Sequence, residues 1–429
     1  MEINIEKLIY GGKGIGKLYG KTCFVPFVID GETVEVRVKK EKKNFIECEL
    51  SSIIEPSPHR VKPLCKYFRY CGGCDYQHIK YEKQIEIKKE ILKETLERLG
   101  KLENIDISKV IPSEKPFFYR NRVQFKVRGN QIGFYMKESN RIVNIDSCLI
   151  LKEDLNESLE GLKELIEFLE FKPVEIHIYS TNLNQVLIKF IYPKRFKRFP
   201  LGLKHIKAFV NKNTVGIGIF EKNNEFLKKF ISIGKQFVYE VINLEEINRE
   251  IKYRVSINSF FQVNRFQVKN LVKEVLEEIK NENYKEALDL YCGVGTITLP
   301  IALYVNKVIG IEANKFAVED GNHNKKLNSL KNVNFIKADA GKNIDILEKY
   351  NPDLVVLDPP RSGITKELLN YLNSKESIKK IVYVSCNPST LARDLAVLSE
   401  RFYIKNIKLI DMFPQTYHIE SITTLEKKR

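Results

Sequence analysis

Hydrophobic and polar positions divide the chain into stretches with different periods. Up to about residue 55 the period is two, because Val34, Val36 and Val38 follow an Asp-Gly turn and alternate with charged residues. In the last third, strand-like and helix-like segments alternate, and residues 268–279 place their apolar side chains on one helical face. Period-two alternation predicts a small antiparallel β unit, and the later alternation predicts a doubly wound parallel sheet.

The middle of the chain mixes one helix with further strands. Residues 81–100 repeat apolar side chains at helical spacing and stop at Gly100, and strand-like patterns return from about 117 to 245. We expect helix 81–100 to pack on the last part of the chain. The fold class is therefore α/β, with three predicted parts: a small β-barrel at 1–55, a central α+β part at 56–245 and a Rossmann-like part at 246–429.

Composition describes an ordinary globular protein of 429 residues, with 43% hydrophobic and 29% charged residues. Apolar runs are too short to span a membrane, and the start "MEINIEKLIYGG" has neither a basic nor an apolar leader region. We therefore expect a cytoplasmic protein without a membrane partner, and a monomer. In that compartment the eight cysteines are expected to be thiols, thiolates or metal ligands rather than disulfides.

The formal net charge is +16, from 71 Lys and Arg against 55 Asp and Glu. A cationic excess favours a polyanionic partner such as nucleic acid, although a lysine-rich composition bias would give the same sum. Two segments fit the first interpretation: the glycine-rich basic loop "YGGKGIGKLYGK" and the mixture of cations and aromatics in "KRFKRF" (194–199). A structural β cap and a solvated charge run are the alternatives.

Polar residues follow the predicted strands of the last third. Gly293 and Gly295 allow a tight turn after the first strand, and Glu312, Asp339 and Asp358 end the next three. Ligands of such sheets lie at the carboxyl ends of the strands. A loop without the third glycine of the pyrophosphate fingerprint favours S-adenosylmethionine over NAD. Helix caps and a turn residue are the structural alternative.

The stretch "YVSCNPSTLARDL" places Cys386 at the end of another predicted strand, with Pro388 breaking that strand. A cysteine in such a position is commonly a small buried residue with an inert thiol. It is also the position from which a nucleophile faces a ligand pocket. The residue pattern leaves both interpretations open.

A second group of cysteines lies between the predicted barrel and the helix. "CKYFRYCGGC" places three of them in a C-x5-C-x2-C pattern: Cys65, Cys71 and Cys74. Cys148 is the leading candidate for a fourth ligand. A tight triplet with one remote cysteine suits a 4Fe-4S cluster better than zinc, which is usually held by two short pairs. Cys23 and Cys48, in the β-rich start, are expected to be core residues.

Several motifs together resemble one family. "DLYCGVGT", "DPPRSG", "VSCNPSTLARDL" and "DMFPQTYHIES", with "SFFQVN" before them, are similar to those of the RNA uracil-5-methyltransferases, and the start of the chain resembles a TRAM domain. The resemblance implies methyl transfer from S-adenosylmethionine to C5 of a uridine in RNA. It favours 23S ribosomal RNA, with the T-loop uridine of transfer RNA second. It also agrees with a 4Fe-4S cluster on the four cysteines.

The resemblance assigns roles to single residues. C5 of uracil is a poor nucleophile, so the chemistry needs a thiolate that adds to C6 and a base that removes the C5 proton. Cys386 matches the nucleophile and Glu420 the base, whereas His418 is expected to orient the loop. The expected cofactor contacts are Gln262, Tyr291, Thr296, Glu312, Asp339 and Asp358.

The glycine loop contains one residue that departs from the family pattern and one that is expected to be structural. Thr296 stands where many relatives have asparagine, and a hydroxyl replaces one amide hydrogen bond but not two. Cys292 is expected to be a small packed residue.

Two other classes of function compete with this interpretation. One is an adenine or glutamine amino-methyltransferase, which would need no thiol, and the other is a non-catalytic RNA-binding or iron–sulfur assembly protein.

Overall fold

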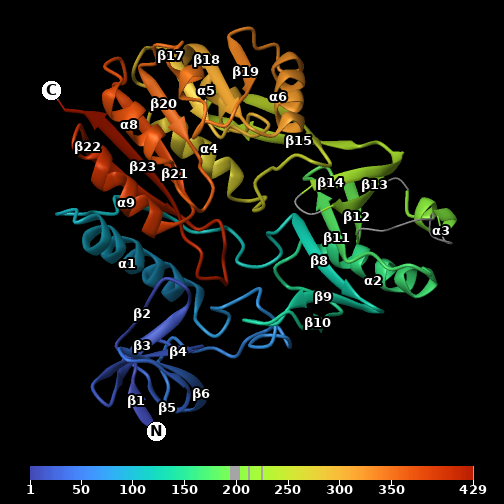
Figure 1. Cartoon of the computed structure of the whole chain (residues 1–429), viewed down its shortest axis with the longest axis vertical. Coiled ribbons are helices and arrows are strands. Elements are labelled where there is room, and N and C mark those ends of the chain that lie inside the picture. Colours follow the sequence, from blue (N-terminus) through green and yellow to red (C-terminus); the bar gives the residue numbers. More distant parts are fainter. Residues whose placement is uncertain (194–202, 211–212, 224–225, 429) are drawn as a thin grey trace.

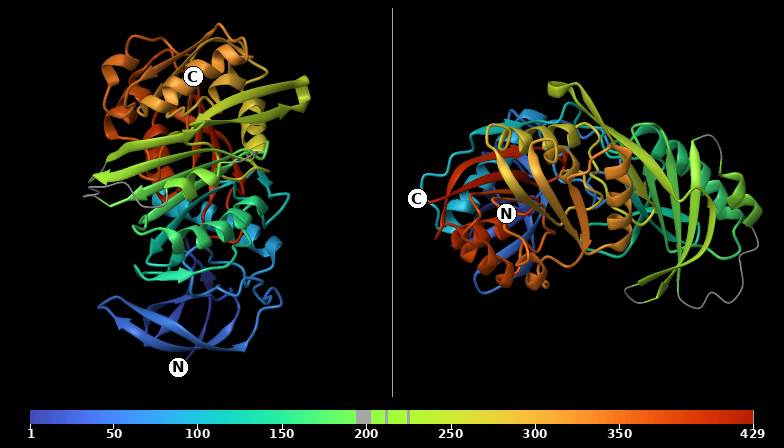
Figure 2. Two further views of the ribbon diagram at one scale, coloured as in Figure 1. Left: turned by 90° about the vertical axis from the view of Figure 1, so that its right-hand side faces the viewer. Right: turned by 90° about the horizontal axis from the view of Figure 1, so that it is seen from above.

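The computed structural model describes most of the chain: residues 1–193, 203–210, 213–223 and 226–428. The cation-rich segment 194–199 lies outside the described residues. A β-barrel occupies one end of the molecule, and the sheet formed by the last third occupies the other (Figures 1 and 2). In the described part of the chain, no helix is long and apolar enough to cross a membrane.

The N-terminal unit is a sheet of six strands in the order β1-β5-β6-β4-β3-β2. The alternation read from the sequence is present in its core, where Val34 and Val36 are buried. Cys23 and Cys48 are buried in the same core, as expected. The strands are β1 (Glu2–Asn4), β2 (Lys7–Leu8), β3 (Lys13–Leu18), β4 (Lys21–Pro26), β5 (Thr33–Glu41) and β6 (Phe45–Glu55).

The central part holds a sheet of seven strands in the order β10-β9-β8-β11-β12-β13-β14. Helix α2 (Glu153–Phe168) packs its leucines against one face of this sheet, and α3 (Leu203–Ala208) follows β12. The strands are β8 (Arg122–Arg128), β9 (Gln131–Tyr135), β10 (Ile142–Asn144), β11 (Glu175–Ser180), β12 (Val186–Tyr192), β13 (Thr214–Asn223) and β14 (Phe226–Gly234).

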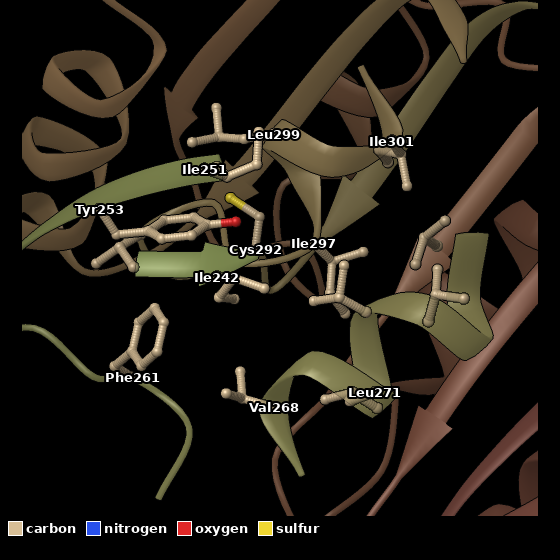
Figure 3. Close-up of a cluster of buried hydrophobic side chains, with 14 of the residues drawn as sticks. Ile242, Ile251, Tyr253, Phe261, Val268, Leu271, Cys292, Ile297, Leu299 and Ile301 are labelled. Carbon is tan, nitrogen blue, oxygen red and sulfur yellow. The ribbon is translucent and has the colours of Figure 1, made fainter. Parts of the chain in front are cut away.

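A two-stranded hairpin connects this sheet to the last third. It consists of β15 (Phe237–Leu244) and β16 (Arg249–Ser256), with the short 3-10 helix η1 (Glu245–Ile247) between them. Its inner face packs against the glycine loop and helix α4, where Tyr253 lies beside Cys292 (Figure 3). Cys292 is buried in this apolar cluster, as expected of a small packed residue.

The last third forms the predicted α/β sheet, with strand order β19-β18-β17-β20-β21-β23-β22-β7. Strands β17 to β21 run parallel, whereas β23 runs antiparallel to both of its neighbours. The strands are β7 (Lys109–Ile111), β17 (Tyr284–Leu290), β18 (Val305–Glu312), β19 (Val333–Lys337), β20 (Leu354–Leu357), β21 (Lys380–Ser385), β22 (Phe402–Ile410) and β23 (Glu420–Lys427). The helices are α4 (Val268–Glu277), α5 (Thr298–Ile301), α6 (Lys315–Leu327), α7 (Ile344–Leu347), α8 (Lys366–Ser374) and α9 (Pro388–Leu398).

Two segments that precede the central sheet in the chain lie with the last third. Helix α1 (Tyr81–Gly100) buries Ile91, Leu92 and Leu96 in the same cluster as the apolar face of α9. Strand β7 pairs in parallel with β22 at the edge of the large sheet. The division of the chain at 55 and 245 stays a prediction, and residues 81–111 contribute structure to the part placed at 246–429.

Candidate active site

A cavity of about 550 Å³ opens at the carboxyl ends of the parallel strands. The strand order changes direction between β17 and β20, and this is the place where open α/β sheets bind ligands. The lining includes the glycine loop, the residues that follow β18, β20 and β21, and the first residue of β23. Segments far apart in sequence thus share one cavity.

The loop after β17 turns sharply beneath this cavity. Tyr291, Gly293 and Gly295 all have left-handed backbone conformations, with φ of 63°, 56° and 93°. At Gly295 a side chain is also excluded by space, since a Cβ atom would lie 2.7 Å from the ring of Phe335. The tight turn places Tyr291 and Gly293 at the cavity wall, where the backbone can approach a ligand closely.

Glu312 ends β18 and holds the glycine loop in place. Its Oε2 accepts a hydrogen bond from the Gly293 N–H at 3.0 Å, and its Oε1 accepts one from the Asn314 N–H at 2.7 Å. Each carboxylate oxygen retains a second acceptor position. Glu312 therefore combines a structural role with free acceptor capacity at the cavity.

Asp358 and Glu420 are two carboxyl groups that line the same cavity and interact electrostatically. Gln262 donates from its Nε2 to Oδ2 of Asp358 at 3.2 Å, and burial raises the pKa of Asp358 to about 7. Burial, followed by the charge of Asp358, raises the pKa of Glu420 well above its usual value. The Oε1 atom of Glu420 is buried without a hydrogen-bond partner in the described structure. At neutral pH this pair retains a proton, because two buried carboxylates this close oppose each other's ionisation.

Cys386 follows the last residue of β21 and lines the same cavity. The chain bends directly after it, since Asn387 caps α9 by accepting a hydrogen bond from the Ser389 N–H and Pro388 is the first helical residue. Burial and the charges of Glu420 and Asp358 raise the pKa of the Cys386 thiol to about 12, and Arg361 opposes them. The thiol is protonated unless a further positive charge enters the cavity.

Arg361 connects the loop 411–419, which leads to Glu420, with the turn that carries Cys386. Its Nη2 donates to Nε2 of His418 at 3.2 Å, and its carbonyl accepts a hydrogen bond from Nδ2 of Asn387 at 2.9 Å. Burial, and then the charge of Arg361, lowers the pKa of His418 to about 3. His418 is therefore neutral and acts as an acceptor for Arg361, and it is not among the residues that line the cavity.

Every predicted catalytic and cofactor residue lines the cavity except Asp339. The carboxylate of Asp339 turns back on its own loop, where Oδ1 accepts from the Gly341 N–H at 3.0 Å. After burial, the charge of Asp339 is the next cause that raises the pKa of Tyr291 to about 12, so Asp339 acts on a residue of the cavity wall without lining the cavity itself.

Some lining residues were not predicted. Asp289 is buried beside the glycine loop, accepts from Oγ1 of Thr298 at 2.5 Å and has a pKa raised to about 7 by burial. The acid in "ALDLYCG", next to the glycine turn, was a usable signal for it. Phe260 lines the cavity and is 54% exposed, and Arg361 is a cationic residue of the cavity lining. A phenylalanine or an arginine alone does not indicate such a position in the sequence.

The loop that carries Glu420 is held by helix α1. Lys88 pairs with Asp411 at 2.6 Å, and the Tyr81 hydroxyl donates to the other carboxylate oxygen at 2.8 Å. Gln84 and Gln415 exchange two hydrogen bonds, from Gln84 Nε2 to Gln415 Oε1 at 3.1 Å and from the Gln415 N–H to Gln84 Oε1 at 3.0 Å. These buried contacts fix where β23 begins.

The four predicted ligand cysteines line a second cavity of about 270 Å³: Cys65, Cys71, Cys74 and Cys148. Burial raises the pKa of Cys74, and the charges of the other three cysteines raise it further. Within the described residues, no group of three or more His, Cys, Asp or Glu side chains is arranged to hold a metal ion. The four cysteines thus line one cavity, but they are not arranged as a compact ligand group for a single metal ion.

The segment that contains Cys65, Cys71 and Cys74 also contacts the loop that leads to Glu420, called the base loop below. Directly after Cys74, the N–H groups of Asp75 and Tyr76 both donate to the carbonyl of Gln415, at 2.9 and 3.0 Å. Gln415 adopts a left-handed conformation, with φ of 67°. The cysteine cavity and the active-site cavity therefore share one backbone junction.

Comparison with known proteins gives matches along the whole chain. Residues 80–428 match the family profile described as tRNA (uracil-5-)-methyltransferase, and residues 1–50 match the TRAM domain. The chain is 40% identical to an uncharacterized RNA methyltransferase of Aquifex aeolicus, with 100% of this chain and 99% of that protein covered. It is 32% identical to an uncharacterized RNA methyltransferase of Thermotoga maritima, with 99% of each covered.

One solved structure is similar over the same length. It is the Pyrococcus abyssi tRNA (uracil-54, C5)-methyltransferase in complex with S-adenosyl-L-homocysteine. The TM-score is 0.77 at 28% sequence identity, and the match covers 99% of this chain and 100% of that one. The similarity includes the barrel, the central sheet and the α/β sheet.

Proposed function

The chain belongs to the tRNA (uracil-5-)-methyltransferase family and carries a TRAM domain, and on that premise we propose that it methylates C5 of a uridine in RNA through covalent addition of Cys386. The observation that carries the proposal is the position of two residues. Cys386, which directly follows β21, and Glu420, the first residue of β23, line one cavity with the glycine loop. A thiol and a base on one side of a nucleoside pocket are what the reaction needs.

The proposed sequence of bonds begins at C6 of the uracil. The Cys386 thiolate adds to C6, which places an electron pair on the C5–C4–O4 system and makes C5 nucleophilic. S-adenosylmethionine, when bound, would supply the methyl group: the C5–CH3 bond forms as the sulfonium S–CH3 bond breaks, and S-adenosylhomocysteine leaves as a neutral thioether. Glu420 then removes the C5 proton, and the C6–S bond breaks as the double bond re-forms. The thiolate is regenerated and the base holds the proton.

Proton acceptors and a cation are available for these steps in the same cavity. The raised pKa values of Asp358 and Glu420 make each carboxylate, when it is ionised, a stronger base than an exposed one. Because the pair retains one proton at neutral pH, it can accept one further proton at a time. Arg361 lowers the pKa values of Cys386 and Glu420 and thereby favours the charged forms that react.

The residues of the cavity fit S-adenosylmethionine. We propose that Glu312 accepts hydrogen bonds from the ribose hydroxyls, for which its second acceptor positions are free. The glycine loop provides the close backbone approach, and Tyr291 provides an aromatic face. We propose Gln262, Thr296 and Asp358 as further contacts, and Asp339 as a group acting from behind the wall.

We propose that the four cysteines hold a 4Fe-4S cluster. Each iron of such a cluster is bound by one thiolate, so the sulfurs surround the cluster rather than one point, in agreement with four thiols around a cavity of about 270 Å³. Among the described residues, the four proposed ligands of this site are all cysteine sulfurs. Its proposed role is structural, because methyl transfer moves no electron, and the Asp75–Gln415 junction would connect it to the base loop.

We propose ribosomal RNA as the substrate, on the resemblance of the cysteine pattern and the N-terminal domain to the ribosomal type. Transfer RNA is the second candidate, because the Pyrococcus abyssi protein that matches over the full length is named as a transfer-RNA enzyme. Since that match includes the N-terminal region, the TRAM domain by itself does not separate the two substrates.

The experiment uses ribosomal and transfer RNA pools tritiated at uracil C5. We expect tritium release that requires S-adenosylmethionine and is abolished in Cys386→Ala, with a Cys48→Ala protein as the matched control. Release from one pool identifies the RNA. An enzyme that methylates RNA without tritium release and tolerates Cys386→Ala is an amino-methyltransferase, and this result would refute the proposal.

A further inference from the structure

One loop of the N-terminal barrel reaches the nucleophile. The loop between β2 and β3 places Tyr10 next to Cys386, and the tyrosine hydroxyl lies 3.4 Å from the carbonyl oxygen of Cys386. The ring of Tyr10 meets the ring of Tyr417 edge-on, with centroids 5.4 Å apart and planes at 89°. Tyr10 therefore contacts both segments that carry the proposed catalytic pair.

The loop is held in this position by its own backbone and by the cysteine segment. The Ile9 N–H donates to the Lys13 carbonyl at 2.9 Å, and the Gly12 N–H donates back to the Ile9 carbonyl at 3.1 Å. Gly12 has φ of 80° and lies against Asp75, where an added Cβ would come within 3.1 Å of the Asp75 Cβ. The barrel thus docks on a fixed surface, and the position of Tyr10 follows from that contact.

The electrostatic environment of Tyr10 is that of the active site. Burial raises its pKa to about 12, with further increases from the charges of Tyr417, Cys386 and Glu420 and an opposing effect from Arg361. The hydroxyl is therefore protonated at neutral pH and is the donor toward the Cys386 carbonyl. It does not line the cavity itself, so its effect passes through the backbone of Cys386.

That backbone is the bend that presents the thiol. β21 ends at Ser385, α9 begins at Pro388, and Cys386 lies in the short connection between them. Asn387 fixes the far side of the bend through Arg361 and Ser389, and Tyr10 contacts the near side. A displacement of the bend would move the sulfur relative to C6 of the base, and reaction rates depend steeply on such distances.

We propose that Tyr10 is a positioning residue for methyl transfer: the TRAM domain, besides binding RNA, fixes the turn that presents Cys386. The inference rests on the proposed role of Cys386. It distinguishes two functions of the barrel, because an RNA-binding appendage alters the KM for RNA, whereas a positioning element alters the rate at saturating RNA.

The test compares full-length Tyr10→Phe and Tyr10→Ala with Ile54→Ala. Ile54 belongs to the same barrel, lies outside the glycine-rich basic loop and has 47% of its surface exposed. One lost hydrogen bond corresponds to a fall of about 3- to 10-fold in kcat for Tyr10→Phe. We expect a larger fall for Tyr10→Ala, which also loses the contact with Tyr417, and a KM for RNA within about twofold of wild type. Ile54→Ala should keep the wild-type kcat.

The second measurement is the single-turnover rate of protein–RNA adduct formation at saturating RNA, in a Glu420→Gln background that retains the adduct. Tyr10→Phe should slow this rate by the same factor as kcat. Thermal melting identifies any variant with a displaced barrel. Tyr10→Phe keeps the aromatic ring, so its adduct-formation rate then decides whether the Tyr10 hydroxyl positions the Cys386 turn.

The outcomes separate this inference from the proposed function. If the parent protein forms no adduct, the role of Cys386 is wrong and the positioning role falls with it. If the parent forms an adduct and the Tyr10 variants change only the KM for RNA, the barrel is an RNA-binding appendage and the positioning role alone is refuted.

Discussion

The ammonium group of Lys88 lies 2.6 Å from Oδ1 of Asp411, and neither side chain has exposed surface. Lys88 also donates to the carbonyl of Phe413 at 2.9 Å. One end of this pair is on helix α1 and the other begins the loop that leads to Glu420. The contact therefore joins a helix from before the central sheet to the proposed catalytic base.

Replacing Lys88 should destabilise the protein strongly. Lys88→Met leaves the Asp411 carboxylate buried without its charge partner, and the expected loss in the free energy of unfolding is about 3–5 kcal/mol. Urea denaturation measures it. Lys89→Met, at the exposed neighbouring position of the same helix, should stay within about 0.5 kcal/mol of wild type. Equal losses in the free energy of unfolding for the two variants would mean that the buried Lys88–Asp411 pair does not stabilise the protein more than an exposed lysine does.

Neutralising the base should trap the reaction after methyl transfer. Glu420→Gln keeps the size of the side chain and removes the carboxylate that accepts the C5 proton, so the C6–S bond has no route to break. We expect a methylated covalent protein–RNA adduct, visible as a shifted band on a denaturing gel, and at least a 100-fold fall in turnover. Cys386→Ala in the same background should show no band. Normal turnover by Glu420→Gln would assign proton removal to another group.

The thiol should react slowly with alkylating agents at neutral pH. Because the pKa of Cys386 is raised to about 12, the thiolate fraction rises about tenfold per pH unit from pH 7 to 10, and the rate of iodoacetamide labelling should follow it. Arg361 lowers this pKa, so Arg361→Gln should raise it further and slow labelling at each pH. Mass spectrometry of the labelled peptide gives the rates. A plateau near pH 8 would contradict the raised pKa.

The cysteine cavity should contain iron when the protein is purified without oxygen. We expect a brown protein, and loss of colour and iron in Cys71→Ser and in Cys148→Ser, whereas Cys386→Ser should keep both. Because Asp75 and Tyr76 hold the Gln415 carbonyl, iron-free protein should also be cleaved faster by protease near residue 415. A colourless protein with one zinc per chain would overturn the cluster assignment.

The α/β sheet could be predicted because its buried strands and amphipathic helices alternate with clear periods. The position of β23 could not, since an antiparallel strand between β21 and β22 has the same apolar pattern as a parallel one. The motifs were sufficient to group Cys386, Glu420 and Asp358 in one site. The role of Asp339 stays a prediction, because a strand end gives the sheet edge but not the direction of the side chain, and Asp339 is not among the residues that line the cavity.

Helix 81–100 was expected to pack on the last third, but the contacts of single residues between distant segments gave no usable signal in the sequence. Residue type gives no sign of a special partner at Lys88 in a helix, at His418 in a loop or at Tyr10 on the rim of the barrel. Tertiary packing determines which residues they contact. For His418 the prediction of an orienting role agrees with its acceptor bond from Arg361, although Arg361 itself was not singled out. Residue type can propose a nucleophile and a base, but packing decides what holds them.

Strand β23 follows β22 in the chain and yet lies between β21 and β22 in the sheet. During translation, a nascent chain that has produced β22 therefore still has a gap in the middle of this sheet. The residue that starts the missing strand is Glu420. The strand that joins β22 to β21 is thus also the strand that carries the proposed base, so a chain that ends before β23 contains Cys386 but lacks both the base and a continuous sheet.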